Sequence, residues 1–135
     1  GVDVTPISPP IPPRPGVAPS ATYRVRVPGR AGPTTLYATV TSWADREGEA
    51  PTPREVFLTL DAAGTDERAW AEALGRSISL GLRAGVPVES YVRTLRGIAG
   101  ESSVARPEGG LYHSAPAAVA EVLAAATKVG AENVG

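Results

Sequence analysis

The period of the hydrophobic pattern changes once along this chain, and that change limits the fold more than any other feature. From Thr22 to Val27 the residues alternate, with Tyr23, Val25 and Val27 on one face. After Thr65 the apolar residues recur about every fourth position, as they do along one side of a helix. Strand-forming segments followed by helix-forming segments favour an α+β fold.

Three segments before residue 61 have the composition and pattern of strands. They are Thr22–Val27, Leu36–Trp43 and Glu55–Leu60. The connection at 28–33 is rich in glycine and proline and is typical of a hairpin turn, while the polar stretch 44–53 reads as a surface loop. We therefore predict a three-stranded antiparallel sheet.

The first helix is expected to run from Thr65 to about residue 84 and to end at Gly85. Thr65 is the predicted N-cap, and the acidic residues after it suit the positive end of the helix dipole. A row of apolar residues at a spacing of four is expected to cover the sheet. The row consists of Trp70, Leu74, Ile78 and Leu82.

Two further helices complete the predicted domain. One opens near Pro87, stops at Gly97 and forms a helical hairpin with the first helix. The other begins near Ser114 and is expected to stop at Gly130. The pattern thus predicts an α+β domain at residues 22–130, with the sheet packed by the helical hairpin and the C-terminal helix, followed by a tail at 131–135.

Residues 1–21 are rich in proline and are predicted to form an extended arm before the domain. Proline fixes φ and lacks the N–H donor, so such a segment favours polyproline II over helix or central strand. Because an arm of this length reaches beyond a small domain, we expect it to dock on a protein partner or on another copy in a homo-oligomer. The residues expected to dock have P-x-x-P-x-Arg spacing. They are Pro9, Pro10, Ile11, Pro12, Pro13 and Arg14.

Composition excludes several classes of function. Cysteine is absent, which excludes disulfides, thiolate nucleophiles and cysteine-based zinc sites. Thirteen basic and fourteen acidic residues give a net charge of −1, which provides no overall field for nucleic acid or an anionic membrane, and no apolar run is long enough to span a bilayer. We expect a soluble protein of the cytoplasm, or a component of a virion-type assembly, without sequence-specific nucleic-acid binding.

Four motifs in the first three quarters of the chain occur in a characteristic order. They are Glu55-Val56-Phe57, Ala73-Leu74-Gly75-Arg76-Ser77-Ile78-Ser79-Leu80, Arg83-Ala84-Gly85-Val86-Pro87 and Leu95-Arg96-Gly97-Ile98. In order and spacing they resemble the TSCPD domain, the module at the C-terminal end of B12-dependent, class II ribonucleotide reductases. The stretch that begins at His113 is similar to the segment by which such domains close.

Two departures limit what this resemblance implies. The cysteine-containing stretch that gives the family its name has no equivalent here, so any metal or thiol role of that stretch does not carry over. The catalytic barrel of the reductase is also missing. The resemblance therefore implies a stand-alone, cysteine-less member rather than a reductase.

The first helix carries the residues that we single out for ligand or partner contact. They are Arg76, Ser77, Ser79 and Arg83, joined by Glu55 on the third strand. The two arginines are seven positions apart, hence nearly on one helix face, and could grip phosphates or carboxylates. The alternative, which we favour, is that Arg76 pairs with Glu72, that the serines allow close packing on the sheet and that Glu55 satisfies an arginine.

No pattern in the chain predicts a catalytic, metal or cofactor site. His113 is the single histidine, and Ser114 beside it is explained as a helix N-cap. Paired carboxylates at a helical spacing, the P-loop and the dinucleotide fingerprint are all absent from the sequence. We expect a protein that is not an enzyme.

Two functions remain open at this point. The first is a non-catalytic module associated with ribonucleotide reductase, which binds a protein partner or a nucleotide-like ligand. The second is a structural protein of a larger assembly, for example a viral one, which uses its proline-rich arm to bind neighbouring subunits.

Overall fold

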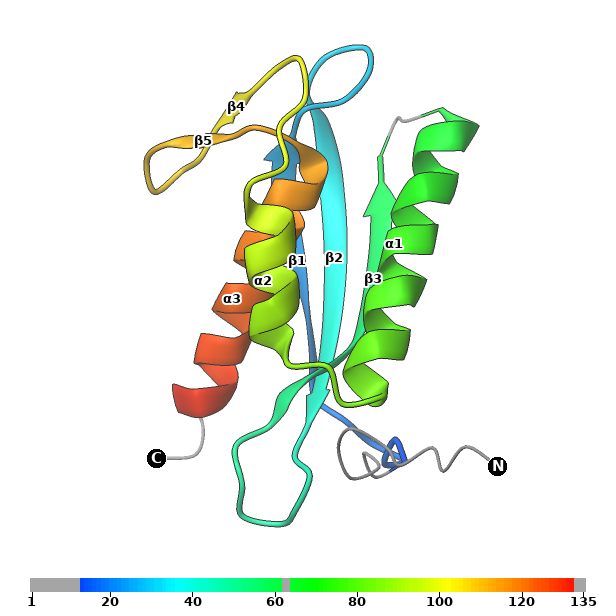
Figure 1. Cartoon of the computed structure of the whole chain (residues 1–135), viewed down its shortest axis with the longest axis vertical. Coiled ribbons are helices and arrows are strands. Elements are labelled where there is room, and N and C mark those ends of the chain that lie inside the picture. Colours follow the sequence, from blue (N-terminus) through cyan, green and yellow to red (C-terminus); the bar gives the residue numbers. More distant parts are fainter. Residues whose placement is uncertain (1–12, 62–63, 133–135) are drawn as a thin grey trace, which may run out of the picture.

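Three long strands form an antiparallel sheet in the order β1-β2-β3, as predicted (Figure 1). The strands are β1, Ser20–Val27; β2, Thr34–Trp43; and β3, Thr52–Leu60. The structure is a computed structural model that describes residues 13–61 and 64–132, so the predicted arm lies mostly outside the described residues. Three helices follow the sheet, namely α1, Thr65–Arg83; α2, Val88–Arg96; and α3, Ala115–Glu132.

A short hairpin precedes α3 and was not predicted. It consists of β4, Val104–Ala105, and β5, Leu111–Tyr112. Gly109 and Gly110 form its turn with φ of 103° and 82°, values that glycine adopts without the steric cost of a Cβ. The hairpin lies at the same end of the molecule as the β1–β2 turn (Figure 1).

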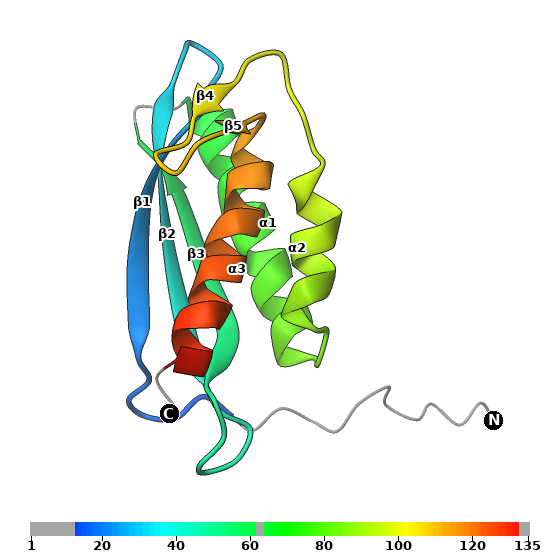
Figure 2. The same ribbon diagram turned by 90° about the vertical axis from the view of Figure 1, so that its left-hand side faces the viewer.

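The helices lie on one side of the sheet (Figure 2). Alternation along β2 places Leu36, Ala38 and Val40 in the core, while Phe57 on β3 is 67% exposed on the opposite face. The sheet is therefore half-buried, which explains the alternating pattern that identified its strands.

The core joins the inner face of the sheet to all three helices. The largest side chains that it buries completely are Leu36, Ile78, Leu82, Leu123, Val27 and Val119. Burying one leucine or isoleucine contributes about 1.5–3 kcal/mol, so this cluster accounts for much of the driving force for folding.

The predicted inward position of Trp70 is wrong, because its side chain is 78% exposed. Residues four apart on a helix are separated by about 400°, so each step turns the row by about 40° and Trp70 lies about 80° from Ile78. The buried face of α1 follows the 3.6-residue period instead. It comprises Gly75, Ile78 and Leu82, with Ala71 and Leu74 half-buried.

Two predicted helix ends also differ from the structure. Thr65 is the first helical residue rather than the N-cap, which is Gly64, and no side chain caps this end. The third helix continues through Gly130 to Glu132, and Gly130 allows a close contact inside the helix: a Cβ there would collide with the carbonyl oxygen of Pro51. The predicted domain boundary at residue 130 therefore falls inside a helix.

Other predicted ends are confirmed. Gly85 follows α1 with φ of 99°, and Ser114 caps α3, since its Oγ accepts a 3.1 Å hydrogen bond from the Ala117 N–H and donates one of 2.6 Å to the Ile98 carbonyl. The helices α1 and α2 meet where the Tyr91 hydroxyl occupies the space beside Gly81. The main packing partner of α2, however, is α3.

Candidate functional site

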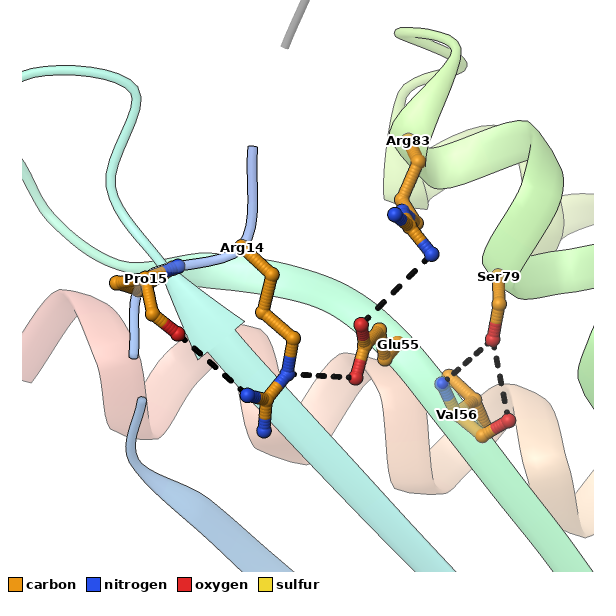
Figure 3. A network of polar contacts seen from close by, with 6 residues as sticks. All are labelled: Arg14, Pro15, Glu55, Val56, Ser79 and Arg83. Carbon is orange, nitrogen blue, oxygen red and sulfur yellow. Dashed lines mark hydrogen bonds and ion pairs between the residues drawn. The ribbon is translucent and has the colours of Figure 1, made fainter. Parts of the chain in front are cut away.

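Glu55 is the centre of a polar network at the edge of the sheet where β3 meets α1 (Figure 3). Its Oε2 lies 3.2 Å from Arg14 Nε, and its Oε1 lies 3.8 Å from Arg83 Nη1. The carboxylate is only 14% exposed, whereas both arginine side chains are about half exposed, at 45% and 53%. Glu55 therefore satisfies two arginines, one from α1 and one from the segment before β1.

Ser79 makes a second contact between α1 and β3. Its Oγ accepts a 2.8 Å hydrogen bond from the Val56 N–H and donates one of 3.1 Å to the Val56 carbonyl (Figure 3). One turn earlier, a Cβ on Gly75 would lie 3.0 Å from the same carbonyl oxygen and 3.3 Å from the Leu58 nitrogen. The helix thus approaches the main chain of β3 closely enough to bind it.

The remaining residues of the predicted contact set lie apart from this network. Arg76 Nη2 lies 3.0 Å from Glu72 Oε1, an i,i+4 pair in which both side chains are mostly exposed. Ser77 is exposed and does not pack on the sheet. The structure therefore brings Glu55, Ser79 and Arg83 together and leaves Arg76 and Ser77 outside.

The predicted arm is represented by its last residues. Pro9, Pro10, Ile11 and Pro12 lie outside the described residues, whereas Pro13 and Arg14 are described and exposed. Besides its contact with Glu55, Arg14 donates a 3.4 Å hydrogen bond from Nη1 to the Pro15 carbonyl (Figure 3). The proposed docking of the arm on a neighbour remains a prediction.

A groove along β1 is a second surface, which the sequence reasoning missed. Residues of β1, the β4–β5 hairpin and α3 line a volume of about 750 Å³, called here the β1 groove. Its apolar part includes Tyr23, Val25 and Val122. Its charged residues are Arg24, Arg26, Arg106, Lys128, Glu108 and Glu121. The alternation of Arg24 and Arg26 was visible in the sequence, but their meeting with Arg106 and Lys128 depends on tertiary structure.

Arg106 and Tyr112 form one wall of this groove. The guanidinium carbon lies 5.1 Å from the centre of the Tyr112 ring, which is within the range of a cation–π contact. Arg106 Nη2 lies 3.7 Å from Glu121 Oε2, and its Nε is buried without a hydrogen-bond partner. Burial raises the pKa of the Tyr112 hydroxyl, and the positive charge of Arg106 partly opposes this shift.

The single histidine, His113, makes a side-chain hydrogen bond with a serine. His113 Nδ1 lies 2.8 Å from Ser103 Oγ, and both residues are exposed. Within residues 13–61 and 64–132, no group of three or more histidine, aspartate or glutamate residues is arranged to hold a metal ion. In the same ranges, no helix has both the length and the apolar character needed to cross a membrane.

Comparisons with known proteins give one match. The family model of the TSCPD domain matches residues 15–127, a span that includes β1 to β5 and most of α3. Comparison with curated proteins gives no match, and comparison with solved structures gives none either.

Proposed function

Because this chain belongs to the TSCPD domain family, we propose that it is a non-catalytic module that associates with ribonucleotide reductase by binding a protein partner. The family match covers 15–127, which contains every element of the sheet. The resemblance to the module of class II reductases supplies the proposed partner.

The observation that carries the proposal is the exposure of two arginine side chains on the surface of α1. Arg76 and Arg83 are more than half exposed, at 79% and 53%, and each is already balanced by a carboxylate. Guanidiniums on an open surface can make bidentate contacts with carboxylates of a large partner. A small nucleotide would need walls that bury most of its surface.

The experiment measures binding of the full chain to a B12-dependent ribonucleotide reductase by calorimetry. We expect saturable binding that weakens about tenfold when Arg76→Gln and Arg83→Gln are combined, since each lost charged contact contributes about 0.5–1 kcal/mol. The matched control combines Arg46→Gln and Arg68→Gln, two exposed positions with the same change in charge. No heat at tens of micromolar reductase would contradict the proposal, while binding of a nucleoside triphosphate instead would favour the nucleotide-like ligand.

One observation favours assembly through the arm as a second candidate. Arg14 fixes the start of the domain to Glu55, but the residues that follow are largely exposed, and Val17 is 92% exposed. An apolar side chain in that position is available to a neighbouring subunit. Deletion of residues 1–20 would then lower the number of subunits in the oligomer, determined from its native mass, whereas an unchanged number would reject this candidate.

A further inference from the structure

The two edges of the sheet differ in what their main-chain groups can bind. The N–H and C=O of Val56 both bind Ser79, so at this position of β3 the main chain points away from β2. Val56 pairs with Val40, whose main-chain groups must therefore point to β1 and its partner there, Ala21. The Ser42 N–H donates to the Pro19 carbonyl at 3.0 Å, which agrees with this assignment two residues further along.

Alternation then fixes the free groups of β1. If Ala21 faces β2, the main chains of Thr22, Arg24 and Arg26 point to the open side of the strand. The described residues place no further strand beside β1 on this side, since β4 and β5 form a separate sheet. Ser20 lies on the same side, so β1 offers four N–H and four C=O groups along a strand about 27 Å long.

We propose that this open edge, together with the β1 groove, is the docking site for an extended segment of a partner protein that alternates acidic and apolar residues. The segment would add a fourth strand to the sheet. This inference rests on the proposed function, because it adds to the α1 arginines a second surface, at the other edge of the sheet, by which the module holds a protein partner.

Charge determines the acidic half of that pattern. The side chains of Thr22, Arg24 and Arg26 share the outer face of the sheet, opposite the helices. A residue paired directly with Arg24 on an added strand would place its own side chain on the same face, about 5 Å away. Glutamate or aspartate there makes an attractive pair.

The same arginines disfavour a second copy of β1 as the occupant. In a two-fold antiparallel pairing centred on Arg24, the two copies of Arg24 would face each other, and like charges directly opposite are destabilising. A pairing centred on Tyr23 would place Arg24 and Arg26 opposite Thr22 and Ser20, where neither arginine gains a carboxylate. On its outer face β1 carries two arginines and no carboxylate, which also favours an acidic occupant. A partner strand of opposite charge is therefore the better fit.

The groove determines the apolar half. Residues of an added strand between the acidic ones would face the helix side, where Tyr23, Val25 and Val122 line the groove. Valine or isoleucine side chains in this position would remove apolar surface from water at about 25 cal/mol per Å². Alternation of acidic and β-branched residues satisfies both faces at once.

The test uses the full, isotope-labelled chain and a ten-residue peptide of alternating glutamate and valine. We expect saturable binding, with slowed amide hydrogen exchange at Thr22, Arg24 and Arg26. A peptide of alternating lysine and valine should bind at least about tenfold more weakly. Absence of protection at millimolar peptide, protection confined to other residues, or equal binding of the lysine peptide would each overturn the proposal.

N-methylated peptides and charge-reversed variants of the protein separate the contribution of main-chain hydrogen bonds from that of charge. When the peptide pairs antiparallel to β1 with its glutamates opposite Arg24 and Arg26, the glutamate N–H groups face β1. N-methylation of the glutamates should therefore abolish binding, while N-methylation of the valines should not. Arg24→Glu combined with Arg26→Glu should reverse the preference between the two peptides, and Arg46→Glu combined with Arg68→Glu is the control of equal charge. Equal effects of the two methylations, or unchanged preference in the double variant, would overturn the docking mode.

Failure of this inference can be distinguished from failure of the proposed function. Reductase binding that survives Arg24→Glu with Arg26→Glu would leave the proposed function intact and overturn the β1 site. Protection of β1 by the acidic peptide without any reductase binding would support the site and contradict the proposed partner. Displacement of the peptide by ATP would instead overturn the protein strand in favour of a nucleotide in this groove.

Discussion

β1 and β3 are the two edge strands of one sheet, yet their main chains meet different surroundings. Along β3, Gly75 and Ser79 bring α1 against the strand, and Ser79 binds the N–H and C=O of Val56. Along β1, the equivalent groups point to the open side of the strand, beside the β1 groove. Since exposed edges invite pairing with other chains, the comparison indicates that one edge is protected by the fold and that the other is available to a partner.

The protected edge, that of β3, depends on two small residues of α1. Gly75 and Ser79 are four positions apart, so both lie on the side of α1 that faces β3. A larger residue at either position would push the helix outwards. Changes at these positions therefore provide direct tests of the protected edge.

The largest expected effect comes from Gly75→Leu. A Cβ at this position already lies within 3.0 Å of a main-chain oxygen of β3, so the longer side chain forces the helix off the strand. We expect a loss of about 3 kcal/mol in the free energy of unfolding, measured by urea denaturation. Ser77→Leu is the control on the exposed side of the same helix, where a change within about 0.5 kcal/mol is expected. Similar losses for both variants would show that the edge contact is not the cause.

The sequence predicted the layers of this fold better than its edges. Alternation identified β1 to β3 because one face of the sheet is buried and the other is exposed. It misplaced Trp70, because a spacing of four approximates a helical stripe over one turn but drifts over two. A longer helix needs the 3.6-residue period to assign its buried face.

The candidate site was predictable only in part. Glu55 as the acceptor of an arginine, and Arg76 as the partner of Glu72, follow from local chemistry and from helix spacing. The contact of Arg14 with Glu55 joins residues 41 positions apart, and no local pattern predicts it. The β1 groove likewise requires β1, the β4–β5 hairpin and α3 to come together.

A smaller effect is expected for Ser79→Ala, which removes the hydroxyl and keeps the helix. The N–H and C=O of Val56 then lose their partner, which costs about 2 kcal/mol, and the better helix propensity of alanine offsets about 0.5 kcal/mol of this. Amide exchange at Val56 should become faster. Ser77→Ala should be neutral or slightly stabilising, and unchanged exchange at Val56 in the Ser79 variant would mean that the edge is protected by other groups.

The smallest effect is expected for Glu55→Gln, which tests how the protected edge is linked to the segment before β1. The neutral amide weakens the contacts with both Arg14 and Arg83, and since these arginines are about half exposed we expect a loss of about 1 kcal/mol. The difference between the variant and the native chain should shrink in high salt, because exposed charge pairs are screened. Limited proteolysis near Arg14 should become faster as the segment detaches from β3.

Glu72→Gln is the matched control for this change, since it removes one carboxylate from an exposed i,i+4 pair on α1. We expect a loss of about 0.4 kcal/mol and no change in proteolysis near Arg14. If both variants accelerate cleavage equally, general destabilisation explains the result. If only the Glu55 variant does so, the carboxylate on β3 holds the segment before β1, and the covered edge of the sheet anchors the start of the domain.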